Sequence, residues 1–250
     1  MNHLVLSQMS SDNEPIVAFT LIRYQEPSLR TLVYLGLDRW TMARTPGLRF
    51  WRLLGVGQGK AFDSHADLRR SAIFSVWHSY AALHQFEVQS ALMKRVRSQA
   101  KEVWTVYMQP VRWHGAWGGQ DPFREMMPAS PPQPGPWVIL TRATIRPSRV
   151  RAFLGAVPAV AEQLLEQPAL LNSVGVGEVP LFYQATLSLW QSLPDVTAFA
   201  YAQQAHREVI RRTRQEGWYS EELFARFRPL AASGTWDGTN PLSQLMTPAS

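Results

Sequence analysis

The sequence predicts an α+β protein built from two tandem ferredoxin-like units that pack sheet to sheet within one chain. Three observations predict this fold class. Apolar patterns typical of strands and helices follow the order β-α-β-β-α-β, and they do so twice. Short sequence blocks recur in both halves of the chain. A proline-rich segment separates the two halves.

The first unit is expected at residues 15–123. It opens with the apolar run IVAFTLIRY, which has the length and composition of a buried strand. Phe86, Met93 and Val96 recur later at helical spacing. The expected order is a strand at 16–24, a helix at 28–45, strands at 48–57 and 71–77, a helix at 80–101 and a strand at 104–113.

The second unit is expected at residues 137–242 and repeats this order. Prolines crowd the segment 124–136 and exclude a helix or a central strand there, so we expect a linker. Residues 1–14 are expected to form a flexible leader and residues 243–250 a tail. The second unit's elements are a strand at 137–146, a helix at 148–166, strands at 170–179 and 181–190, a helix at 194–217 and a strand at 224–232.

Four sequence blocks recur in both units in the same order, which indicates an internal duplication. The matched pairs are Gly55-Val56-Gly57 with Gly175-Val176-Gly177, Ser75-Val76-Trp77 with Ser188-Leu189-Trp190, Phe86 with Phe199, and Trp117 to Pro122 with Trp236 to Pro241. A ferredoxin-like sheet carries its helices on one face, so two such sheets can cover each other's free faces, as in a dimeric α+β barrel. A cofactor could then lie between a sheet and its own helices.

Composition excludes several classes of protein. Apolar residues make up 46% and charged residues 18% of the 250 residues, as in globular proteins. The absence of cysteine excludes disulfides, thiolate heme ligation and iron–sulfur clusters. We see neither an apolar run of roughly 20 residues that would span a bilayer nor a secretory signal, so a cytoplasmic protein is expected. The net charge of +6 suits anionic partners, but no nucleic-acid-binding motif occurs.

His206 is the strongest candidate for chemistry. Together with Phe199 and Ile210 it falls on one stripe of the expected helix at 194–217, facing the sheet. A neutral imidazole in such a place can bind iron. An ordinary core histidine, hydrogen-bonded to a carbonyl, is the alternative. The matched residue of the first unit is Met93, so packing alone does not require histidine there. No other histidine has ligand spacing, which leaves a heme with histidine ligation as the metal site that the composition allows.

Two other features have competing interpretations. The run Gly55-Val56-Gly57-Gln58-Gly59 resembles a nucleotide-binding loop, but no helix follows it, so a structural turn before the next strand is expected. Arg142 lies on a strand of the second unit. If it faces the helices, it is a candidate distal or propionate-binding group of a heme site, and otherwise it is a strand residue that faces outward.

Several blocks resemble the spheroidene monooxygenase family of carotenoid biosynthesis, and the resemblance covers most of residues 15–242. The blocks are RTPGLRFWRLLGVGQG (44–59), TRATIRPS (141–148), GVGEVP (175–180), EELFARF (221–227) and GTWDGTNPL (234–242). The resemblance implies a heme-containing oxygenase that adds oxygen to the terminal region of acyclic carotenoids. Dioxygen and reduced ferredoxin are the implied co-substrates. The family's histidine before the closing strand falls on His206.

The leading hypothesis is therefore a heme b monooxygenase that acts on an apolar substrate, resembling enzymes that make keto-carotenoids. His206 would be the iron ligand, Trp190, Phe199 and Ile210 the pocket walls, and Arg142 the candidate catalytic or polar group. A basic surface would suit a ferredoxin donor or peripheral contact with anionic lipid, and a homo-oligomer is a further expected partner. The alternatives are a heme-binding protein without turnover and a heme-free α+β barrel that binds an apolar small molecule.

Overall fold

The computed structural model describes residues 14–26, 29–59, 65–129, 134–178, 183–202 and 204–243. Side chains are described throughout these ranges except at 29–35, 201–207 and 210. The leader expected at 1–14 and the tail expected at 243–250 lie outside the described residues, apart from Glu14 and Ser243. The middle of the linker expected at 124–136 also lies outside them.

The described residues form two halves of the same construction, each with four strands. The first half contains β1 (Ile16–Tyr24), α2 (Leu29–Ala43), β2 (Leu48–Gly57), β3 (Ala66–Trp77), α3 (Tyr80–Gln89), α4 (Ala91–Gln99) and β4 (Ala100–Gly115). The second half contains β5 (Trp137–Ile145), the 3-10 turn η1 (Pro147–Arg149), α5 (Val150–Leu165), β6 (Leu170–Gly177), β7 (Tyr183–Trp190), α6 (Leu193–Ala202), α7 (Gln204–Glu216) and β8 (Tyr219–Gly234).

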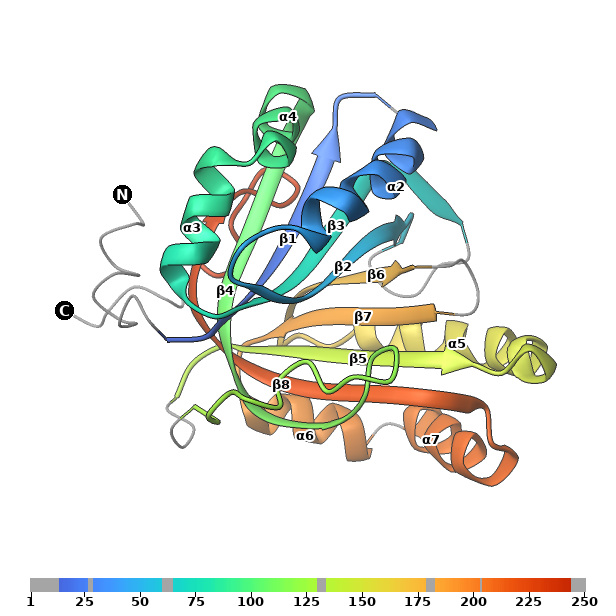
Figure 1. Ribbon diagram of the computed structural model, residues 1–250. Coiled ribbons are helices and arrows are strands. Elements are labelled where there is room, and N and C mark those ends of the chain that lie inside the picture. Colours follow the sequence, from blue (N-terminus) through green and yellow to red (C-terminus); the bar gives the residue numbers. More distant parts are fainter. Residues whose placement is uncertain are drawn as a thin grey trace.

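The eight strands close into one antiparallel barrel in the order β1-β3-β2-β6-β7-β5-β8-β4. Within each half the order is that of a ferredoxin-like unit, β4-β1-β3-β2 and β8-β5-β7-β6. Helices α2, α3 and α4 cover the outer face of the first half, and α5, α6 and α7 cover the outer face of the second (Figure 1). The predicted fold class, two ferredoxin-like units joined as an α+β barrel, is confirmed.

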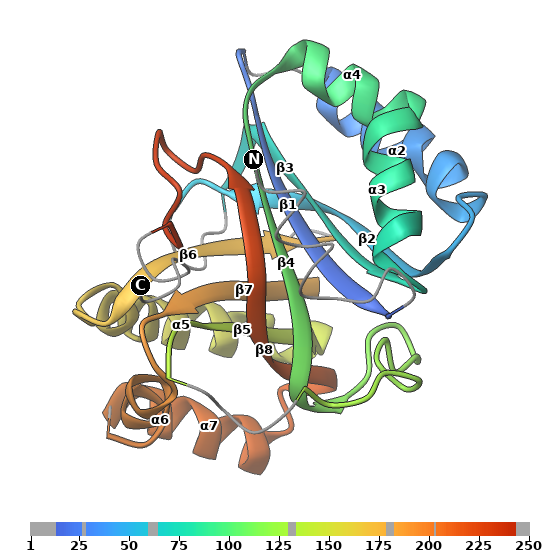
Figure 2. The same ribbon diagram turned by 90° about the vertical axis from the view of Figure 1, so that its left-hand side faces the viewer.

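The two halves meet along two seams of unequal length. Strands β4 and β8 pair from Trp104 opposite Gly234 to Gly115 opposite Leu223, and they run side by side in Figure 2. Strands β2 and β6 pair through two adjacent residue pairs, Gly55 with Gly177 and Val56 with Val176. The repeated Gly-Val-Gly blocks thus form the short seam. The strand expected at 48–57 is confirmed as β2, and the turn expected before the next strand begins with a bend at Gln58 and Gly59.

The barrel interior is filled with apolar side chains from every strand, because alternate residues of each strand point inward. The two repeated Trp-containing loops add to it from opposite ends. Trp117, after β4, packs on Phe74 at a ring distance of 5.3 Å, and Trp236, after β8, packs on Trp104 at 5.1 Å. Both tryptophans are buried. The repeat of these loops is therefore explained by packing, since each one closes an end of the barrel.

The long helix expected at 80–101 is two helices, because Ser90 adopts an extended conformation between them. The Ser90 N–H donates to the carbonyl of Phe86, and its hydroxyl accepts the N–H of Met93, so it ends α3 and caps α4. The helix expected at 194–217 is likewise two, α6 and α7, on either side of position 203, which lies outside the described residues. None of the described helices is long and apolar enough to cross a membrane.

Candidate functional site

A row of four residues crosses the outer face of the second sheet, beneath its helices. It consists of Phe224 on β8, Thr141 on β5, Thr186 on β7 and Gly175 on β6, each the direct partner of the next. We call these four residues the outer row. In the strand register of the first half, the corresponding row consists of Thr105, Thr20, Ile73 and Leu53. This register places Gly175 with Leu53, two residues before Gly55, to which the sequence repeat matches it. Two large apolar side chains of the first half are therefore replaced by threonine and glycine in the second.

This replacement opens the sheet surface. In the first half Thr20, Ile73 and Leu53 are all buried, with exposed fractions of 7%, 5% and 8%. In the second half Thr141 is exposed and Thr186 is half-buried, although both lie in the middle of strands on the helix-bearing face. The side chains described above the outer row thus leave Thr141 accessible and Thr186 partly accessible.

The apolar packing between sheet and helices differs in the same way. In the first half one continuous cluster includes Leu53, Ile73 and Met93. In the second half the described apolar side chains form two separate clusters, one around Trp190 and the other around Trp218. Of the outer row, only Phe224 packs against either cluster.

His206 lies on α7 at the place that Met93 has on α4. One constant offset relates Trp77 to Trp190, the start of α3 to that of α6, and the start of α4 to that of α7. Met93 is buried with an exposed fraction of 5%, in the same cluster as Ile73 and Leu53. The side chains of His206 and Ile210 lie outside the described residues, so the stripe expected for them stays a prediction.

Trp190 and Phe199 lie together between the second sheet and α6. Both are buried, and their ring centroids are 5.4 Å apart. The indole N–H of Trp190 donates to the hydroxyl of Ser188 at 2.9 Å. On the adjacent strand β5, Ile139 pairs directly with Ser188 and belongs to the same cluster as Trp190 and Phe199. This pair forms an apolar wall at one side of the outer row.

Arg142 lies on the opposite face of the sheet and is not brought together with Trp190 and Phe199. Its neighbours Val138 and Leu140, at period-two spacing, belong to the barrel interior. The guanidinium is buried, with an exposed fraction of 3%, and forms an ion pair with Glu221. The expectation that Arg142 faces either the helices or the solvent was wrong, because strand alternation directs it into the barrel.

Glu221 holds the loop that follows β4 and closes one end of the barrel, and we call this set of hydrogen bonds the latch. Its carboxylate accepts the N–H groups of Gly118 at 2.9 Å and Gly119 at 2.6 Å. In the other half Glu102 accepts the N–H groups of Asp237 at 3.0 Å and Gly238 at 2.7 Å. Burial raises the pKa of Glu221, but the two N–H donors and Arg142 more than offset it, so that pKa lies below its usual value. Arg142 thus reinforces a structural latch.

Sequence reasoning missed a cationic edge beside the outer row. Arg226 follows Phe224 on the outward-facing side of β8, with its guanidinium 5.4 Å from the Phe224 ring centroid. Arg112 of β4 is its direct partner across the strands. Like charges in opposite places are unfavourable unless an anion or solvent separates them. Period-two alternation in EELFARF could have indicated that Phe224 and Arg226 share a face, but the pairing with β4 joins distant parts of the chain.

The described residues fit a flat, largely apolar ring that carries carboxylates. Three residues of the outer row, Thr141, Thr186 and Gly175, have small side chains, and Phe224 ends the row at β8. An apolar wall stands at one side, and Arg226 and Arg112 lie at the β8 edge. Within the described ranges no three His, Cys, Asp or Glu side chains converge as in a multidentate metal site. A heme needs one axial ligand from the protein and holds its iron in its own ring.

Comparison with known proteins gives close relatives. The chain is 35% identical over 231 residues to the spheroidene monooxygenase of Rhodobacter capsulatus, covering 92% of this chain and 96% of that protein. It is 31% identical to the one from Cereibacter sphaeroides, over 92% of this chain and 72% of that protein. It is 35% identical to the one from Rubrivivax gelatinosus, over 77% of this chain and 73% of that protein. No family model matches the chain.

Among solved structures, two aldoxime dehydratases have the same fold. One aligns with a TM-score of 0.55 over 89% of this chain and 82% of its own, at 11% identity. The other, a complex with butyraldoxime, aligns with a TM-score of 0.54 over 88% of this chain and 80% of its own, also at 11% identity. Similarity at this identity concerns the fold alone.

Proposed function

Since the chain belongs to the spheroidene monooxygenase family, we propose that it is a heme-dependent monooxygenase that oxidises an acyclic carotenoid to a keto-carotenoid. The observation that carries this proposal is the 35% identity across 92% of the chain with a relative of that name. Dioxygen and a ferredoxin-type electron donor complete the proposed reaction, and the net charge of +6 suits an acidic donor.

His206 is the proposed axial ligand, on α7 above the outer row. The argument is one of matched positions. In the first half Met93 packs in one cluster with Ile73 and Leu53, and in the second half these three are replaced by His206, Thr186 and Gly175. A ligand and the room for a planar ring thus replace three apolar side chains together.

The remaining described residues are assigned by what they contact. Trp190 and Phe199 are the proposed apolar wall, with Ile210 as the third wall residue expected from the sequence. Arg226 is the proposed partner of the ring's carboxylates, because it stands at the edge of the outer row. Arg142 has no place in this site, since it lies inside the barrel.

Heme bound there supplies the binding and activation of dioxygen. The protein's part is to hold the ring, keep water away and position an apolar polyene. A polyene chain offers no groups for hydrogen bonding, so apolar walls such as Trp190 and Phe199 are the means by which it can be held.

The first experiment is an absorption spectrum of the purified protein with hemin added. We expect a Soret band that disappears in His206→Ala and persists in His84→Ala, a histidine on α3 of the first half. Incorporation of isotope-labelled dioxygen into a lycopene-type carotenoid, dependent on reductant, then tests turnover. Heme binding without oxygen incorporation would favour the carrier alternative. If the protein takes up no hemin, the result favours the other alternative, a heme-free barrel that binds an apolar small molecule.

A further inference from the structure

Helix α2 ends in an apolar stripe that no described residue covers. Leu37 is 61% exposed and Trp40 is 67% exposed, far more than is usual for such large side chains. Thr41 and Arg44 follow on the same side of the helix at steps of three and four. The guanidinium of Arg44 lies over the Trp40 ring at 4.5 Å, so a cation and an indole are presented together.

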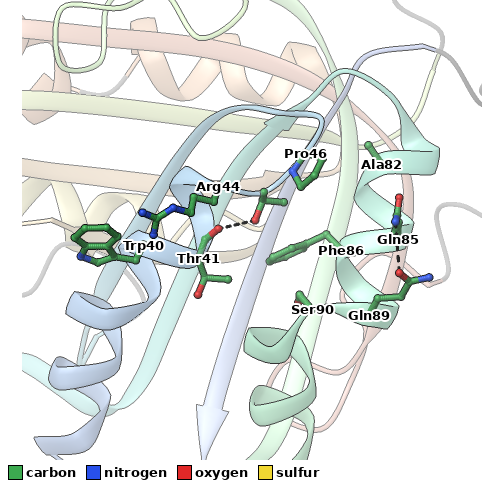
Figure 3. Close-up of a pocket in the computed structure, with 10 residues that line it drawn as sticks. Trp40, Thr41, Arg44, Pro46, Ala82, Gln85, Phe86, Gln89 and Ser90 are labelled. Atoms are coloured by element: carbon green, nitrogen blue, oxygen red, sulfur yellow. Dashed lines mark hydrogen bonds between the residues drawn. The ribbon is translucent and has the colours of Figure 1, made fainter.

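Beside this stripe is an open pocket of about 480 Å³ between α2 and α3. Figure 3 shows Phe86 projecting from α3 into the space between the two helices, with Trp40 on the far rim. Pro46 and Ala82 add apolar surface, while the lining from α3 also includes neutral Gln85. The pocket therefore has an uncharged floor of mixed apolar and neutral polar side chains, with Trp40 and Arg44 at its rim.

The helical layer around this pocket carries exposed charges of one sign. The exposed charged side chains described on and just after its helices are Arg39, Arg44, Lys94 and Arg97. Its two acids are withdrawn from the surface. Asp38 is buried and forms an ion pair with Arg95, and Glu87 accepts a hydrogen bond from Tyr107.

The helical layer of the second half provides the comparison. Its helices expose acids among the bases, for example Glu162 on α5, Glu166 just after α5, and Glu208 paired with Arg211 on α7. Its largest exposed apolar side chain among those described is Leu165, at 47%. The combination of exposed indole, exposed leucine and unopposed cations is thus a property of one face of the molecule.

We propose that the α2–α3 face is a docking surface for an anionic lipid bilayer. Tryptophan and arginine at a rim match the interfacial region of a membrane, where an indole sits at headgroup level and a guanidinium meets phosphate. Unopposed cations are attracted to an anionic leaflet. An acidic protein would satisfy the cations, but it would not require an exposed leucine and an uncharged pocket beside them. This docking goes beyond the proposed reaction and does not depend on heme.

The chain has no cysteine, so a single label can be placed at will. Leu37→Cys and, as the matched control on the other half, Leu165→Cys would each carry a polarity-sensitive fluorophore. With phosphatidylglycerol vesicles we expect a blue shift for the label at position 37 and none at 165. With phosphatidylcholine vesicles we expect a much weaker shift at 37. No shift at 37, or equal shifts at both positions, would overturn the proposal.

A second measurement removes the side chains themselves. Trp40→Ser with Arg44→Gln should lower the fraction that sediments with phosphatidylglycerol vesicles, with an apparent affinity about tenfold weaker. Leu165→Ser with Arg151→Gln makes the same change of charge on α5 and should leave sedimentation unchanged. Circular dichroism confirms that both variants are folded. Unchanged sedimentation of the first variant, or a label at 37 that responds to an acidic protein and not to vesicles, would contradict lipid docking.

Discussion

Thr141 of β5 stands directly opposite Thr186 of β7 on the outer face of the second sheet, where the first half pairs Thr20 with Ile73. The two halves share strand order, helix starts and closing loops. The difference between the halves at this row is therefore local, because the rest of the architecture is shared. At this row the second half replaces Ile73 and Leu53 by smaller side chains, and on the helix above it replaces Met93 by His206. The proposed heme site depends on these replacements occurring together.

Refilling the row is the direct test of that coincidence. Thr186→Ile restores the side chain of the first half at a half-buried strand position, where a β-branched residue is well tolerated. We expect hemin affinity to fall at least tenfold, with an unchanged or slightly raised melting temperature. Titration of the Soret band and thermal unfolding measure the two quantities.

The reciprocal substitution is the control. Ile73→Thr removes apolar volume from a packed cluster and buries a hydroxyl, so it should cost about 1–3 kcal/mol of unfolding free energy. Hemin affinity should stay at the level of the unaltered protein. If Thr186→Ile bound hemin normally, the heme would not lie on the outer row.

Arg226 is predicted to pair with the carboxylates of the ring. Arg226→Ala should weaken hemin binding about fivefold, as expected for a partly exposed ion pair. It should leave the binding of hemin dimethyl ester unchanged, because the ester lacks the anionic partner. Lys101→Ala, an exposed cation at the other end of β4, is the control and should affect neither ligand. Equal loss for hemin and its ester would assign Arg226 a packing role instead.

Arg142 is predicted to matter for stability and not for heme. Arg142→Met removes the cation from the half-buried Glu221 carboxylate, which should cost about 1–3 kcal/mol of unfolding free energy. The Gly118 and Gly119 donors remain, so the loop stays in place. Denaturant unfolding measures the loss, and the Soret spectrum should be unchanged in any folded sample. A shifted Soret band would restore Arg142 as a polar group of the heme site.

The strand order and the barrel were predictable because they follow from period-two patterns and a repeat that the sequence itself displays. The break in the helix at Ser90 could not be predicted. Serine caps a helix only where its own backbone is extended, and the helical pattern of the neighbouring residues does not indicate such a backbone. To predict which face of the sheet Arg142 occupies, one must know which alternate residues of its strand point into the barrel core. Val138 and Leu140 could have settled it, but Trp137 and Ile139 are equally apolar, so both faces of this strand are buried.

The outer row was harder to predict from the sequence. Its residues come from four strands, and neither Thr141 nor Thr186 stands out in the sequence, while the sequence repeat matches Gly175 to Gly55 and not to Leu53. Only the strand register shows that these residues are neighbours. Only the comparison with Ile73 and Leu53 shows that their side chains are smaller than those of the first half. Arg226 depends on the same register, through its pairing with Arg112 of the other half.

Glu87 makes stability depend on pH in a defined direction. Burial raises its pKa from 4.5 to about 7, against the opposing effects of the Tyr107 hydroxyl, which donates to it at 2.8 Å, and of Arg97. The folded state therefore binds more protons than the unfolded state between these two values, and the free energy of unfolding falls as pH rises through that window. We expect a loss of about 3 kcal/mol, complete once pH exceeds the folded pKa. Glu87→Gln, which keeps an acceptor for Tyr107, should flatten this slope in urea unfolding, while Glu166→Gln on the exposed end of α5 should leave it. A slope that persists in Glu87→Gln would assign the titration to another group.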